Sequence, residues 1–168
     1  MHREGLVCNN VERHITSCGD NEDVQMAVCG VFETQRWQMS DYVERFRDRP
    51  FYQQCLAVFD SLIERVSYHV DPIGEQLIKT PARLLHDGVG DCKSMTVYCA
   101  SCMWSLGADV IIRFVSFTKD KNYTHVYCVV SNGSESYIMD PVERTKSNGY
   151  IFNYARPFVY KKDYKYRQ

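Results

Sequence analysis

Residues 88–93, which read Gly-Val-Gly-Asp-Cys-Lys, lead from a turn into a run of residues with helical periodicity. The two glycines let the backbone bend tightly, and Asp91 is a residue type that caps helix N-termini. The apolar face of the following helix consists of Met95, Cys99, Cys102, Met103 and Leu106. Gly107 then ends the periodic run. The stretch therefore predicts a central helix with Cys92 in its first turn.

A cysteine at the start of a helix is placed to act as a nucleophile. Only the thiolate attacks carbonyl carbons, and the partial positive charge of a helix N-terminus lowers the pKa of a thiol there. The backbone N–H groups of the same turn can stabilise an oxyanion. The negative charge of Asp91 opposes ionisation of Cys92, so we expect a cationic neighbour for Cys92.

A β-hairpin supplies a candidate for that neighbour. Residues 123–130 and 135–140 read as strands, and the Asn132-Gly133 dipeptide between them is a strong hairpin signal. A turn centred on Asn132-Gly133 pairs Cys128 with Tyr137 and His125 with Asp140. Opposed residues share one face of an antiparallel pair, so Asp140 is expected to orient His125, and a three-residue loop would separate them.

The remaining periodicity predicts one α+β domain over residues 24–168, after a flexible N-terminal arm over residues 1–23. Helices are expected at 24–37, 42–47, 52–66 and 81–85, and strands at 110–117, 123–130, 135–140 and 150–160. Pro157 predicts that the last strand lies at a sheet edge. The N-terminal helices and the Cys-bearing helix would pack on an antiparallel sheet of three or four strands.

Several short motifs occur in a defined order between residues 60 and 142. They are Tyr-His-Val-Asp-Pro at 68–72, Lys-Thr-Pro at 79–81, Gly-Asp-Cys-Lys-Ser at 90–94, Leu-Gly at 106–107, Thr-His-Val-Tyr at 124–127 and Ile-Met-Asp-Pro at 138–141. This set resembles the transglutaminase-like superfamily, a branch of the papain-like cysteine enzymes. The resemblance implies a papain/transglutaminase-like core in which Cys92 is the nucleophile, His125 the base and Asp140 the residue that orients it.

The resemblance implies acyl transfer on an amide or peptide bond, with a protein or peptide as substrate. Members of the superfamily include cross-linking enzymes, deamidases, peptidases, amidases and inactive relatives. No calcium-loop signature such as an EF-hand is present, which favours hydrolysis over regulated cross-linking. Short forms that resemble this chain occur in bacteria and their phages. Gln76 could add a second oxyanion donor, or it could be a solvated loop residue.

Two other interpretations of the motifs stay open. One is a catalytically idle module that keeps the fold as an interaction or phage structural part. The other is an NlpC-like cell-wall peptidase, which also has a cysteine at a helix start. That class usually requires export, and the third member of its triad is typically a histidine, whereas this sequence offers Asp140.

Composition narrows the class of protein. The formal net charge is -1 over 168 residues, so no nucleic-acid partner is expected. No signal peptide or apolar span is apparent, which predicts a cytoplasmic protein without a membrane contact. The eight cysteines are expected to be reduced, several of them packed as small apolar residues. We expect no metal and no cofactor, because the only CxxC, at residues 99–102, has no partner pair. The oligomeric state is not indicated.

Overall fold

A computed structural model describes residues 12–16, 21–72, 75–143 and 149–168. The helices are α1 (Asn21–Gln35), α2 (Ser40–Val43), α3 (Phe51–Ile63), α4 (Pro81–Asp87) and α5 (Cys92–Ser105), with 3-10 turns at Arg36–Met39 and Glu44–Phe46. The strands are β1 (Glu12–Thr16), β2 (Ser67–Tyr68), β3 (Glu75–Lys79), β4 (Val89–Gly90), β5 (Asp109–Ser116), β6 (His125–Ser131), β7 (Ser136–Met139) and β8 (Tyr160–Tyr166). Within these ranges, no helix has both the length and the apolar character required to cross a bilayer.

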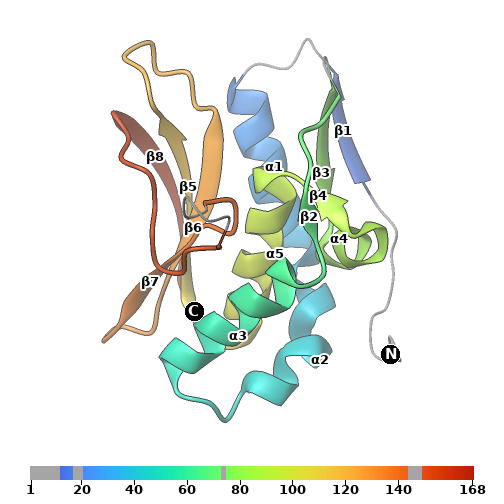
Figure 1. The fold of residues 1–168 in the computed structure, drawn as a ribbon, viewed down its shortest axis with the longest axis vertical. Coiled ribbons are helices and arrows are strands. Elements are labelled where there is room, and N and C mark those ends of the chain that lie inside the picture. Colours follow the sequence, from blue (N-terminus) through green and yellow to red (C-terminus); the bar gives the residue numbers. More distant parts are fainter. Residues whose placement is uncertain (1–11, 17–20, 73–74, 144–148) are drawn as a thin grey trace.

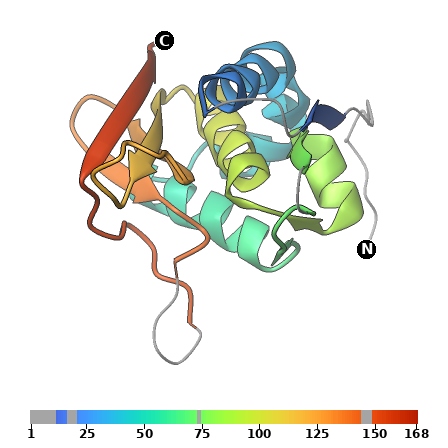
Figure 2. The same ribbon diagram turned by 90° about the horizontal axis from the view of Figure 1, so that it is seen from above.

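Helix α5 lies at the centre of the molecule. The β5–β8 sheet covers one side of it, and the β1–β3 pair lies on the other (Figure 1). Seen from above, the blue α1 and the teal α3 flank α5 (Figure 2). Residues 92–103 of α5 are all buried. This burial on every side explains why a helix with many small and polar residues forms the core, since tertiary contacts and not amphipathicity stabilise it.

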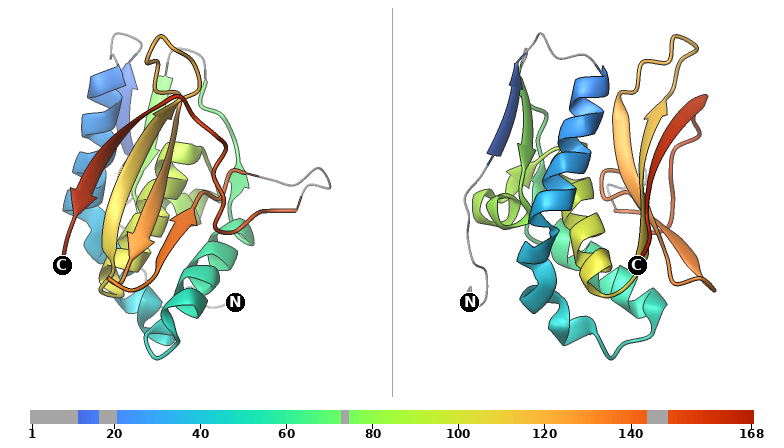
Figure 3. Two further views of the ribbon diagram at one scale, coloured as in Figure 1. Left: turned by 90° about the vertical axis from the view of Figure 1, so that its left-hand side faces the viewer. Right: turned by 180° about the vertical axis from the view of Figure 1, so that it is seen from behind.

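The four-stranded sheet has the order β7-β6-β5-β8, with every neighbouring pair antiparallel. The α+β architecture and the sheet of three to four strands are confirmed. The prediction of a last strand at residues 150–160 is wrong, because β8 spans Tyr160–Tyr166. Pro157 precedes the strand, and β8 does lie at the sheet edge, beside β5 (Figure 3).

Strands β1 and β3 lie where the sequence indicated none, as do the two-residue strands β2 and β4. Strand β1 falls inside the predicted flexible arm, and it pairs antiparallel with β3, so that Ile15 is opposite Gln76. Helix α1 also starts inside that range, at Asn21. Strands β1 and β3 have only five residues each. Strands this short form because a partner strand is available, and not because of the β-propensity of their residues. Gln76 therefore lies in a strand and not in a loop.

The hairpin register differs from the prediction by two residues. Cys128 is opposite Met139 and not opposite Tyr137, and Ser131 is opposite Ser136. The loop therefore contains residues 132–135, and the backbone N–H of Asn132 donates to Glu135 O at its base. A shift of two preserves the face on which each side chain lies, because side chains alternate with a period of two.

Candidate active site

The backbone turns sharply immediately before Cys92. Gly88 has φ +69° at the C-terminus of α4, a conformation that glycine adopts without strain. At Gly90 a Cβ atom would come 2.4 Å from Leu84 Cδ1, so any side chain there would force the buried Leu84 to shift. The turn that contains these two glycines places Cys92 at the first position of α5, where Cys92 is 9% exposed.

Asp91 caps α5, as predicted. Its Oδ1 accepts hydrogen bonds from the backbone N–H groups of Lys93, at 3.0 Å, and Ser94, at 3.4 Å. The cap therefore occupies two N–H groups of the first turn that we expected to be available to an oxyanion. The backbone N–H of Cys92 is not among the groups that Asp91 engages.

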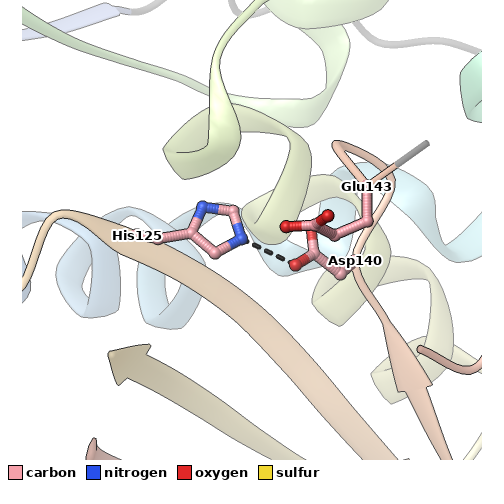
Figure 4. Close-up of side chains that lie close together, drawn as sticks. All are labelled: His125, Asp140 and Glu143. Carbon is pink, nitrogen blue, oxygen red and sulfur yellow. Dashed lines mark hydrogen bonds and ion pairs between the residues drawn. The ribbon is translucent and has the colours of Figure 1, made fainter. Parts of the chain in front are cut away.

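His125 and Asp140 are hydrogen-bonded to each other across the hairpin. His125 Nε2 lies 2.6 Å from Asp140 Oδ2, and Figure 4 shows the imidazole directed at that carboxylate. The two residues are not directly opposed, contrary to the prediction. Asp140 immediately follows the end of β7 and lies diagonally from His125 on the same face of the pair. It is 1% exposed, so little water competes for the bond.

The imidazole of His125 also lies near Cys92, since both residues line one cavity and Cys92 contributes to the raised pKa of the ring. Because Nε2 faces Asp140, Nδ1 is the nitrogen that remains for the sulfur. Burial alone lowers the pKa of His125, but the hydrogen bond to Asp140 and the electrostatic influence of Cys92 outweigh burial and raise that pKa to about 10. The ring is therefore charged at neutral pH and stacks against Phe117, with 6.2 Å between the ring centroids.

Cys92, His125 and Gln76 line one cavity of about 300 Å³. The other residues around it are Asn21, Val24, Lys93, Phe114, Tyr123, Thr124 and Val126. Asn21 Nδ2 donates to Asn122 Oδ1 at 2.8 Å, which joins the start of α1 to the loop before β6 beside this cavity. Three of the four predicted site residues therefore line this cavity. The fourth, Asp140, does not line it but is hydrogen-bonded to His125.

Three residues near Cys92 were not singled out from the sequence. Lys93 is buried and forms ion pairs with Asp91 and with Asp71, the latter at 3.0 Å. Tyr68 lies near Cys92 and Asp91. Burial, and to a smaller extent the charges of these two residues, raise the pKa of the Tyr68 hydroxyl to about 12. The only sequence signal was that Tyr68 and Asp71 belong to the motif at residues 68–72 and Lys93 to the one at 90–94.

The possible metal ligands among the described residues are His125, Asp140 and Glu143, whose donor atoms lie within 4.8 Å of one another. Glu143 lies beside Asp140 in Figure 4. The Nε2 of His125 is already bonded to Asp140, so this arrangement fits an ion pair between an imidazolium and a carboxylate better than a preformed metal site.

Solved structures with a similar fold include proteins described as proteases. A candidate cysteine protease from Cytophaga hutchinsonii matches at 12% identity and a TM-score of 0.49, over 92% of this chain and 62% of that one. A candidate protease from Parabacteroides distasonis matches at 7% identity and a TM-score of 0.55, over 70% of this chain and 26% of that one. LapG of Legionella pneumophila matches at 19% identity and a TM-score of 0.51, over 89% and 84%.

These likenesses concern the fold. This chain spans less than two thirds of the length of the Cytophaga and Parabacteroides proteins. The similarity to LapG and to the Parabacteroides protein shows a shared fold. No protein-family model matches the chain, and a search of the curated proteins finds no relative.

Proposed function

We propose that this protein is a cysteine-dependent acyl-transfer enzyme that hydrolyses an amide or peptide bond through a thioester on Cys92. The observation that carries the proposal is that Cys92, at the start of α5, lines one cavity with His125, whose ring is hydrogen-bonded to the buried Asp140. The protease described from Parabacteroides distasonis has the same fold and supports the reaction class.

In the proposed first step the Cys92 thiolate attacks the carbonyl carbon of the substrate. The carbonyl oxygen becomes an oxyanion, to which we assign two donors, the backbone N–H of Cys92 and the side-chain amide of Gln76. His125 donates its proton to the leaving amine as the carbon–nitrogen bond breaks, and the acyl group stays on the sulfur. Asp140 keeps the ring oriented and charged until that transfer.

In the second step water attacks the thioester carbonyl. His125, now neutral, takes a proton from the water, the carbon–sulfur bond breaks and the carboxylic acid leaves. The thiolate and the imidazolium are thereby restored. A second amine in place of water would give cross-linking instead, so the acceptor determines whether the enzyme acts as hydrolase or transferase.

The test is iodoacetamide labelling as a function of pH, with peptide mapping of all eight cysteines. Cys92 should alkylate well below the ordinary thiol pKa of about 8.5. Burial raises the pKa of the core thiols, that of Cys55 to about 12, so these should stay unlabelled. Cys8 and Cys18 lie outside the described residues and serve as internal references. His125→Ala should abolish the selectivity, and a wild-type protein in which Cys92 labels only near the ordinary thiol pKa would favour a catalytically idle module.

A second assay separates the reaction types. Peptide, glutamine-amide and peptidoglycan substrates are offered with and without an added amine. Hydrolysis without amine incorporation supports the proposal, and amine incorporation into a glutamine substrate would identify a cross-linking transferase. Turnover of peptidoglycan alone would favour an NlpC-like peptidase, although the carboxylate partner of His125 is atypical for that class.

A further inference from the structure

A buried group of three charges adjoins Cys92. Lys93 Nζ forms ion pairs with both Asp71 and Asp91, and the three side chains are 9%, 11% and 6% exposed. Burial by itself lowers the pKa of Lys93, but the two carboxylates outweigh it, and the net pKa is raised. The two ion pairs therefore favour the charged form of Lys93. Lys93 lies between Asp91, which caps α5, and Asp71, which belongs to the motif at residues 68–72.

Asp71 connects this cation to strand β3. The same Oδ2 atom that pairs with Lys93 accepts a hydrogen bond from the backbone N–H of Leu77 at 2.8 Å. Leu77 is the neighbour of Gln76, which lines the cavity together with Cys92. One carboxylate oxygen therefore joins the first turn of α5 to the position next to the proposed oxyanion donor.

A second link fastens β3 to the same turn of α5. The backbone N–H of Lys79 donates to Ser94 Oγ at 3.0 Å, and Ser94 Oγ donates to Leu77 O at 3.5 Å. The other edge of β3 is paired with β1. Residues 93 and 94 thus hold the strand at Leu77 and Lys79, and among the described residues this strand belongs to a two-stranded sheet.

We propose that Lys93 and Asp71 are positioning residues that hold Gln76 against Cys92, and that the Lys93 ammonium also offsets the charge of Asp91 beside the thiolate. This inference rests on the proposed function. The geometry assigns two separable effects to one lysine. The contact through Asp71 acts on the oxyanion side of the reaction, whereas the contact with Asp91 acts on the ionisation of the thiol.

Two small reagents distinguish these effects on the whole protein. With iodoacetamide, the thiolate bonds to the methylene carbon as the carbon–iodine bond breaks and iodide leaves, so no oxyanion forms. With p-nitrophenyl acetate, the thiolate adds to the carbonyl carbon, the carbon–oxygen bond to the aryl group breaks, and p-nitrophenolate leaves while the acetyl group stays on Cys92. Alkylation therefore measures the thiolate alone, and the burst of p-nitrophenolate measures thiolate and oxyanion stabilisation together.

Gln76→Ala should slow the burst by about 10²-fold, typical of losing one oxyanion donor, and leave alkylation unchanged. Asp71→Asn weakens the link to Lys93 and should slow the burst at least about tenfold, again with normal alkylation. In the double variant Asp71→Asn/Gln76→Ala the burst should be no slower than in Gln76→Ala alone, because both changes remove the same contribution. Asp163→Asn, which removes a comparable ion pair with Arg113 in the sheet, is the matched control.

Lys93→Met should differ from Asp71→Asn in one respect. It leaves two buried carboxylates uncompensated, so the pH midpoint for alkylation should rise, whereas Asp71→Asn should leave it unchanged or lower it. Lys93→Arg should restore both rates to within a few-fold of wild type. If Lys93→Met does not fold, Asp71→Asn and Lys93→Arg, checked by thermal unfolding, still decide the matter.

A normal burst in a folded Asp71→Asn variant, or independent effects of Asp71→Asn and Gln76→Ala, would overturn the positioning role. A lowered melting temperature with both reagents reacting normally would leave Lys93 and Asp71 a structural role only. These results differ from failure of the proposed function, which would appear as an unreactive Cys92 in the wild-type protein itself.

Discussion

His125 and Asp140 are 15 residues apart in sequence, yet His125 Nε2 lies 2.6 Å from Asp140 Oδ2 at the base of the candidate active site. The bond joins a ring at the start of β6 to a carboxylate just beyond the end of β7. It fixes which nitrogen of the imidazole faces Cys92, and the mechanism proposed above depends on that choice.

The variant Asp140→Asn should therefore show how much the negative charge of Asp140 contributes to the reactivity of Cys92. The amide keeps the shape of the carboxylate but removes the charge that favours the imidazolium, so the alkylation midpoint of Cys92 should move up toward about 8.5. The p-nitrophenolate burst should fall by about 10³- to 10⁴-fold, as expected when a triad carboxylate is lost. An unchanged midpoint in a folded variant would contradict the role given to Asp140. Asp163→Asn again serves as the control.

The titration of His125 predicts how stability depends on pH. Burial alone lowers the pKa of His125, but the hydrogen bond to Asp140 and the influence of Cys92 raise it to about 10, whereas an unfolded histidine titrates near 6.5. Between these values the folded state binds more protons, so the contribution of His125 to stability is fully present below about pH 6.5 and is lost as pH rises to about 10.

Denaturant unfolding of wild type and His125→Asn across this window checks that prediction. The difference in free energy of unfolding between the two should shrink toward high pH by at least about 1.4 kcal/mol, the equivalent of one pKa unit. Cys92→Ala should show a smaller effect, because one of the two groups that raise the pKa of His125 is gone. Parallel stability curves for wild type and His125→Asn would rule out the linkage.

The turn before Cys92 should not tolerate a side chain. In Gly90→Ala the new Cβ would approach Leu84 Cδ1 at 2.4 Å, and Leu84 is fully buried. We expect a loss of about 1–3 kcal/mol in the free energy of unfolding, typical of overpacking. Leu84→Ala alone should cost about 2–5 kcal/mol by leaving a cavity.

The double variant Gly90→Ala/Leu84→Ala should be more stable than the sum of the two losses predicts, because shortening Leu84 removes the clash. Urea unfolding of the four proteins in this cycle provides the measurement. Simple additivity would mean that the chain relaxes elsewhere and that Gly90 is not constrained by Leu84.

Asp87 at the end of α4 should stabilise the fold in a pH-dependent way. Burial by itself raises its pKa, but bonds to Lys79, Arg83 and His86 lower that pKa well below the ordinary value. Its contribution is therefore present above about pH 3.9 and is lost as the solution becomes more acidic. Asp87→Asn should melt several degrees below wild type at pH 7, with the gap closing toward strongly acidic pH. A constant gap would contradict this assignment.

Local residue patterns were sufficient to predict the α+β class, the helix that starts at Cys92, its Asp91 cap and the pairing of His125 with Asp140. Each depends on interactions within a few residues or on the period of two in a strand. The hairpin register was predicted two residues away from its observed position, because Asn132-Gly133 is the first half of a four-residue loop. The side-chain contact survived that error, since a shift of two leaves both residues on one face.

Contacts between distant segments decided the rest. Strand β3 and the place of Gln76 depend on β1 and on the first turn of α5, neither of which is adjacent to β3 in the chain. The pairing of Lys93 with Asp71 across 22 positions likewise has no local signature. The sequence itself indicated that Cys92 is a candidate nucleophile, whereas tertiary packing determined which of the other side chains surround it. The reason is that buried charges and short strands are stable only beside partners supplied by the rest of the fold.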